Sequence, residues 1–185
     1  MHMALGVLGL KTNHPDLYVL GILNVILGGN MSSRLFNEVR EKRGLAYAIS
    51  SGVKSLDDTG LTVIRAGVDN TKIVGAVAVI LKELAKIRQK GVTDDELKRA
   101  KDYFLGQFLL GLEDTMDHML WIGETEISRD GVRSAEDVRS AVLRVKPADI
   151  KRIAVELFDP KRLNLSVVGP LTDAQEKDLR KELKI

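Results

Sequence analysis

Residues 27–50 read LGGNMSSRLFNEVREKRGLAYAIS and begin with a glycine pair that separates two predicted helices. Apolar residues repeat at helical spacing over residues 16–27 until Gly28-Gly29 stops the pattern, which predicts a buried helix ending there. We interpret Gly28 and Gly29 as a hinge loop between helices. A phosphate-binding loop would need a closing Lys-Ser or Lys-Thr pair and a preceding strand, and this stretch has neither.

The remainder of the stretch predicts a second helix followed by a strand. A short helix should open at Ser32 or Ser33, whose hydroxyl groups suit an N-cap, and end at Gly44, because glycine is favoured just beyond a helix C-terminus. Residues 45–53 are strand-like, and residues 60–68 form a second such run beyond an acidic turn. These two runs predict an antiparallel hairpin.

The flanking sequence completes an α+β pattern. The other predicted elements are a strand over 3–9, a helix over 70–91, a helix that opens with a capping box at Thr93 and runs toward Ser128, two shorter helices that begin near Ser134 and Lys146, a strand over 163–168 and a charged helix over 172–184. Long helices after a block of strands are typical of a largely antiparallel sheet with helices on one face. No repeat or low-complexity linker divides the chain, so we expect one domain over residues 1–185.

Composition excludes several classes of partner. Lys and Arg number 28 against 26 Asp and Glu, and the two signs are interleaved along the chain, which argues against a nucleic-acid partner. No apolar run approaches the ~18 residues that a membrane span needs, and the start of the chain lacks the pattern of a signal peptide. We therefore expect a soluble protein, cytoplasmic or periplasmic. The strand-like start suggests a domain taken from a longer polypeptide.

The chain lacks the usual residues of a hydrolytic centre. It has no cysteine, and its three histidines, His2, His14 and His118, are never one helical turn apart, so neither His-Glu-x-x-His nor its inverted form is present. We expect no zinc on this chain and no activity from it alone. His118 is interpreted as a packed helix residue. The acidic residues at 113–114 and 124–126 are interpreted as solvated helix faces.

The stretch over residues 27–50 resembles the second half of pitrilysin/insulinase-type zinc peptidases, a family that includes mitochondrial processing peptidase. Members typically carry a run much like LGGGMSSRLFxxVREKxGLAYSV, and Asn30 stands where the third glycine is usual. A looser similarity covers residues 57–60, 91–101 and 164–170. The resemblance implies a processing-peptidase-like α+β domain.

The same resemblance implies a division of roles between two halves. In the family, the first half holds zinc through an inverted His-x-x-Glu-His motif and a later Glu. The second half supplies an Arg and a Tyr, seven positions apart, that reach the substrate carbonyl. Arg40 and Tyr47 have this spacing, and a cation and a phenol are suitable donors for an oxygen that gains negative charge. Arg34 belongs to the same signature and is expected to be structural.

The resemblance therefore predicts a non-catalytic half that contacts a peptide substrate, with zinc held by a partner. That partner is either the zinc-binding half of the same polypeptide or a separate catalytic subunit. An alternative is an inactive scaffold or assembly subunit, which has no reason to retain Arg40 and Tyr47. An independent hydrolase with an unrecognised site is a third possibility. An isolated domain could also self-associate as a homo-oligomer through an apolar face near Gly28-Gly29.

Overall fold

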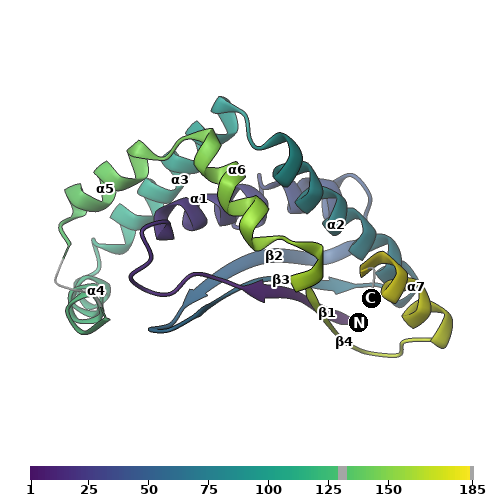
Figure 1. The fold of residues 1–185 in the computed structure, drawn as a ribbon. Helices are drawn as coiled ribbons and strands as arrows, with labels where there is room; N and C mark the ends of the chain where they lie inside the picture. The colour runs from purple at the N-terminus through teal and green to yellow at the C-terminus, as the bar shows by residue number, and fades with distance from the viewer. Residues whose placement is uncertain (129–132, 184–185) are drawn as a thin grey trace.

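The structure, a computed structural model, describes residues 1–128 and 133–183. Its elements follow in the order β1 (His2–Leu8), α1 (Leu17–Leu27), a π-helical turn (Phe36–Glu41), β2 (Ala46–Ser55), β3 (Gly60–Val68), a 3₁₀ turn (Asn70–Lys72), α2 (Ile73–Lys90), α3 (Asp94–Gly111), α4 (Thr115–Ser128), α5 (Ala135–Arg144), α6 (Pro147–Leu157), a 3₁₀ turn (Pro160–Arg162), β4 (Asn164–Val168) and α7 (Asp173–Leu183) (Figure 1). Lys184, the last residue of the predicted terminal helix, lies outside the described residues.

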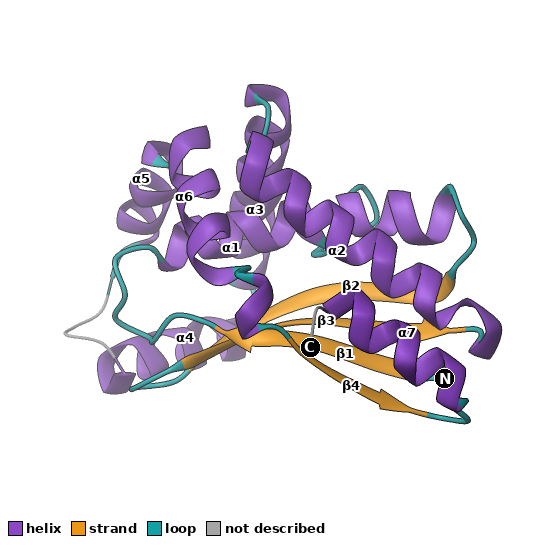
Figure 2. Ribbon diagram, turned by 45° about the vertical axis from the view of Figure 1, so that its right-hand side comes forward, coloured by secondary structure: helices purple, strands orange, loops and turns teal. Residues whose placement is uncertain are grey.

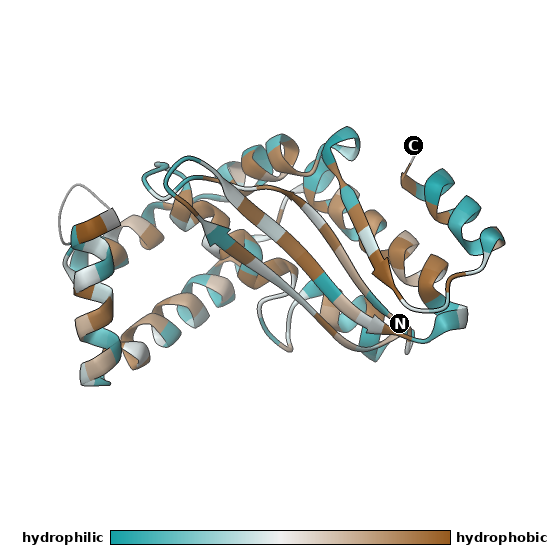
Figure 3. Ribbon diagram, turned by 90° about the horizontal axis from the view of Figure 1, so that it is seen from below, coloured by the Kyte–Doolittle hydropathy of each residue, from teal (hydrophilic) through white to brown (hydrophobic). Residues whose placement is uncertain are grey.

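Within the described residues, four antiparallel strands form one sheet in the order β2-β3-β1-β4. Helices cover one face of this sheet (Figures 1 and 2). Figure 3 looks onto the opposite face, where the strands cross the centre of the view without a helix in front of them. We call this second face the open face. The predicted α+β class and the β2-β3 hairpin are confirmed.

The core lies between the covered face of the sheet and the helices. Helix α1 is enclosed by the sheet and by other helices, because it packs on β2 and also contacts α3 and α6. Leu20, Ile22 and Leu23 of α1 are fully buried, as are Ile73 and Ile80 of α2. Each such side chain contributes roughly 1.5–3 kcal/mol through burial. This apolar layer holds the sheet at a fixed distance from α1.

The prediction of one helix from Asp94 toward Ser128 is wrong, because the structure has two helices here. Gly111 ends α3, and the Asp114 carboxylate then accepts hydrogen bonds from the amides of Met116 and Asp117, at 2.8 and 3.0 Å. Asp114 therefore caps a new helix, α4. Figure 1 shows α4 at one end of the molecule, apart from the sheet. Large apolar side chains are exposed along the end of α3 and along α4: Leu109, Leu110, Met116, Met119, Leu120, Ile122 and Ile127.

The predicted short helix before Gly44 is present but irregular. Its central residues form a π-helical turn, in which the Lys42 amide donates to the Asn37 carbonyl at 2.9 Å. Leu35 and Val39 are fully buried, and Phe36 is half-buried. Gly44 has a φ of 56°, a left-handed conformation that favours glycine, so it ends the helix as expected. π-helical turns occur frequently at functional sites.

Gly28, just after α1, and Gly106, within α3, give opposite expectations for substitution by alanine. A Cβ at Gly28 would lie 2.6 Å from the backbone nitrogen of Ser51, whereas a Cβ at Gly106 would meet nothing within 4 Å. Gly28→Ala should therefore lower the free energy of unfolding by about 1–3 kcal/mol through overpacking. Gly106→Ala should raise it by up to about 1 kcal/mol, because alanine is the better helix former. Denaturant unfolding of the two variants measures both values, and a Gly28→Ala protein as stable as wild type would contradict the close approach.

Candidate functional site

Several of the side chains on the open face of the sheet are small. The strand register places His2 of β1 and Ala48 of β2 on either side of Gly67 of β3, and the next row on the same face contains Ala4, Arg65 and Ser50. A cavity of about 590 Å³ lies over these rows, and its lining includes His2, Arg40, Tyr47, Ser50, Arg65 and Ser166. The structure thus brings Arg40 and Tyr47 to one cavity, where they are joined by His2 and Arg65.

Tyr47 reaches this face because of a β-bulge in β2. Ala46 pairs with Val68 and Ala48 pairs with Gly67, which leaves Tyr47 as the extra residue. Its side chain is 63% exposed. A Cβ at Gly67 would overlap the Tyr47 ring, so the ring occupies space that only glycine leaves free. Bulges re-aim side chains and are frequent beside active sites.

His2 is the neighbour of the Tyr47 phenol. The Tyr47 hydroxyl lies 3.3 Å from Nε2 of His2, and the two rings meet edge to face with centroids 6.2 Å apart. The phenol donates this hydrogen bond when Nε2 is unprotonated. His2 precedes the hairpin by more than forty positions. It reaches the cavity through the register of β1 with β3, and no local sequence motif indicates this.

Arg40 lies on the π-helical turn beside the cavity. Its guanidinium lies 4.8 Å from the centre of the Phe36 ring, a cation–π contact, and its Nε lies 3.8 Å from the Glu41 carboxylate. The side chain is 44% exposed. The remaining carboxylate of this segment, Glu38, accepts instead from Lys42 and from Arg43, each at 2.6 Å. These hydrogen bonds lower the pKa of Glu38 to about 2.

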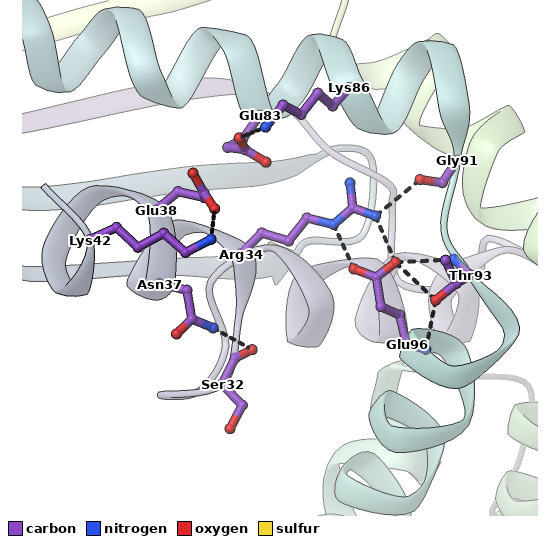
Figure 4. Close-up of polar contacts among 10 residues, drawn as sticks. All are labelled: Ser32, Arg34, Asn37, Glu38, Lys42, Glu83, Lys86, Gly91, Thr93 and Glu96. Carbon is purple, nitrogen blue, oxygen red and sulfur yellow. Dashed lines mark hydrogen bonds and ion pairs between the residues drawn. The ribbon is translucent and has the colours of Figure 1, made fainter.

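Arg34 anchors the loop that leads to Arg40, as Figure 4 shows. Its guanidinium donates two hydrogen bonds of 2.8 Å to Glu96 and one of 3.1 Å to the Gly91 carbonyl. Glu96 also closes the capping box with Thr93 at the start of α3. Burial raises the pKa of Glu96, but the hydrogen bonds from Arg34 and Thr93 outweigh this effect and hold it below its ordinary value. These contacts show that Arg34 has a structural role.

The glycine pair lies at the start of the same loop. The Gly28 carbonyl accepts from the Ser51 amide at 3.0 Å, which joins the end of α1 to β2. Asn30 accepts a hydrogen bond of 2.8 Å from the Ser32 amide through its side chain, and so stabilises a turn. Met31 beside it is 75% exposed. The role of Gly28 and Gly29 as a hinge, and self-association near them, stay predictions.

Metal-binding residues do not gather in the described part of the chain. No group of three His, Asp or Glu side chains in residues 1–128 and 133–183 is placed to hold a metal ion. The His14 Nδ1 accepts from the Asp16 amide at 3.1 Å, so this ring serves the start of α1. His118 was expected to be packed but is exposed on α4, beside Trp121 with ring centroids 5.9 Å apart.

None of the helices in the described residues combines the length and the apolar character that crossing a bilayer requires.

The fold and the cavity define an α+β domain in which Arg40 and Tyr47 line a cavity over the open face of the sheet, and the described residues contain no group placed to hold a metal. Comparison with known protein families identifies the class to which this domain belongs. The family model described as peptidase M16 inactive domain matches residues 1–104. The chain belongs to this family, as an inactive domain, and the resemblance to pitrilysin/insulinase-type zinc peptidases is confirmed.

Individual relatives agree with this assignment. An uncharacterized zinc protease of Streptomyces coelicolor is 39% identical over 178 residues, covering 96% of this chain and 39% of the relative. A protease from Helicobacter pylori has a solved structure with a TM-score of 0.81 and 25% identity, covering 89% of this chain and 40% of that one. The M16 inactive domain from Pseudomonas fluorescens, at 23% identity and a TM-score of 0.79 over 89% of this chain and 40% of that one, shows the same fold. The chain thus spans about two-fifths of the length of the curated relatives it matches.

The Arg34–Glu96 contact should stabilise the domain in a pH-dependent way. Glu96→Gln keeps a residue suited to the capping box but removes the charge, so it should lower the free energy of unfolding by about 1.5–3 kcal/mol at neutral pH. The folded-state pKa lies below the ordinary value of 4.5, so the contribution is complete above that pH and is lost as pH falls through the folded-state pKa. Unfolding measured against pH tests this.

The exposed Glu176–Arg180 pair provides the control. Glu176→Gln should cost about 0.3–0.5 kcal/mol. Equal losses for Glu96→Gln and Glu176→Gln would show that the Arg34 contact does not anchor the loop.

Proposed function

We propose that this chain is the non-catalytic half of a zinc-dependent metalloendopeptidase and that its open face holds the peptide substrate. The observation that carries the proposal is the convergence of Arg40 and Tyr47 on one cavity, from a π-helical turn and a β-bulge. Each of the two side chains lies on a local irregularity of the backbone. The names of the relatives, zinc proteases, support the reaction class.

The chemistry of the pair suits a carbonyl oxygen. A guanidinium and a phenol both donate hydrogen bonds, and such donors stabilise the oxygen most when it gains negative charge in the tetrahedral intermediate. His2 lies within hydrogen-bonding distance of the Tyr47 hydroxyl and orients it. Arg40 and Tyr47 thus act on the substrate oxygen from the side opposite the zinc.

Zinc and its glutamate base would come from the partner, because the described residues offer no set of ligands for a metal. The partner is a zinc-binding half in the same polypeptide or on a separate subunit, and zinc there would supply the activated water. The residues of this chain bind and orient the peptide. An assembly subunit with no role in proteolysis would not depend on Arg40 or Tyr47.

Substitution of the pair tests the proposal in the protein joined to its zinc-binding half. Loss of one donor in comparable oxyanion sites lowers kcat by about a hundredfold or more, and we expect this for Tyr47→Phe and for Arg40→Ala. Steady-state kinetics measures the effect, and metal analysis should show unchanged zinc. Because both residues address one oxygen, the double variant should lose less than the product of the single losses.

The assignment has a clear contrary outcome. Thermal melts of the single variants report whether either residue is needed for folding. If both variants fold normally and retain near-normal kcat, Arg40 and Tyr47 have no part in catalysis, and the assembly role is the better account.

Gly67 provides a second test that leaves both donors in the chain. The atoms that a Cβ at Gly67 would overlap belong to the far end of the Tyr47 ring, which can move aside. Gly67→Ala should therefore fold but displace the phenol, and should lower kcat by roughly as much as Tyr47→Phe. Combined with Tyr47→Phe it should add little further loss. A Gly67→Ala enzyme with full activity would show that the position of the ring over Gly67 is not needed.

A further inference from the structure

Arg65 is a charged residue in the middle of the open face that the proposed carbonyl contact does not use. It lies on β3, which is flanked by β2 and β1. It is therefore not one of the edge-strand charges that prevent a sheet from pairing with another molecule. Its side chain is exposed, and in the described residues it takes part in no ion pair. Its cross-strand neighbours, Ala4 and Ser50, are small. An arginine here is therefore accessible from the cavity.

The charges around the cavity all have one sign. Arg40 and Arg65 are the charged residues of its lining, and no Asp or Glu is part of it. The carboxylate that comes near, Glu41, lies 3.8 Å from the Arg40 Nε on the flank of the turn. A concave surface lined by one sign of charge concentrates the opposite charge. The chain as a whole has a formal net charge of only +2, so this concentration is local.

We propose that the open face recognises a carboxylate of the peptide substrate and that Arg65 is the residue that binds it. The carboxylate could be an Asp or Glu side chain or the C-terminus of the peptide. Arginine suits this task because its planar group can donate two parallel hydrogen bonds to a carboxylate. The inference rests on the proposed function, and it names the substrate class for the same site.

The strand register predicts where this carboxylate lies along the peptide. Arg65 is in the row next to that of Gly67, over which the Tyr47 ring lies. Adjacent rows on one face are two residues apart along a strand, or about 7 Å. An extended peptide covers that distance in about two residues. A carboxylate held by Arg65 should therefore lie about two residues from the bond whose carbonyl contacts Arg40 and Tyr47.

Cleavage of a degenerate peptide library by the protein with its zinc-binding half tests this placement. Mass spectrometry of the products should show Asp and Glu, or a free C-terminus, enriched at one position about two residues from the cleaved bond. Substrates with Glu and with Gln at that position, each as the free acid and as the C-terminal amide, then separate the two sources of the carboxylate. For the preferred carboxylate, Arg65→Gln should lower kcat/KM by about tenfold or more, with little change for its neutral analogue.

Lys54 provides the matched control, because it is an exposed cation on the same face of β2 that lies outside the cavity lining. Lys54→Gln should leave the preference intact, and Arg65→Lys should restore part of it. The inference is overturned if wild type shows no preference for a carboxylate, or if Arg65→Gln keeps that preference.

Binding measured without catalysis separates this inference from the proposed function. Labelled Glu and Gln peptides can be titrated against the zinc-depleted protein, where Arg65→Gln should abolish the difference in affinity. If that difference is present while Arg40 and Tyr47 variants keep full kcat, the carboxylate site stands and the catalytic proposal fails. If kcat depends on Arg40 and Tyr47 but the peptides bind alike, the carboxylate site is wrong and the proposed function stands.

Discussion

The hydrogen bond from the Ser51 amide to the Gly28 carbonyl closes the loop on which the candidate site depends. Both Arg40 and Tyr47 lie between these two positions in the chain, so the contact fixes the two ends of the segment that carries them. It forms only because Gly28 has no side chain, since a Cβ there would meet the Ser51 backbone. The Ser51 hydroxyl adds a hydrogen bond of 2.7 Å to Asn24 of α1. Burial of α1 against the sheet therefore determines where the site is built.

The hydrogen bond between Gly28 and Ser51 fixes only the two ends of this segment. Two further features fix the position of the residues between them. Arg34 joins the first part of the loop to the junction of α2 and α3 through Glu96 and the Gly91 carbonyl. Beyond it, the π-helical turn and the β-bulge each depart from regular geometry at the segment that bears a candidate residue. Irregular backbone is retained when the surrounding packing determines it, and here Leu35 at the start of the π-helical turn and Val39 within it are fully buried.

Much of this arrangement could be predicted from the sequence, and the exceptions have physical causes. The strands, α1, α2 and the Thr93 capping box follow from short-range patterns, and those patterns appear in the structure. The break at Asp114 was missed because apolar spacing continues through it, while the deciding interaction is a side-chain cap. The bulge at Tyr47 depends on pairing with β3, and the positions of His2 and Arg65 depend on the register of three strands. Such long-range pairings are not contained in any local pattern.

The charge distribution explains why most donors of the two arginines that line the cavity are not occupied by carboxylates of the described residues. The segment around Arg40 contains carboxylates, and a carboxylate paired closely with Arg40 would occupy the donors that a substrate needs. Glu38 accepts from Lys42 and Arg43 instead, with a pKa of about 2, and Glu96 is held by Arg34. Glu38 and Glu96 are therefore each bound to another cation, which leaves Glu41, 3.8 Å from the Arg40 Nε on the flank of the turn, as the carboxylate near Arg40. The small residues of the floor, Ala4, Ser50 and Gly67, contribute no charge, so donors on the open face keep their hydrogen-bonding capacity for a group that comes from outside the chain.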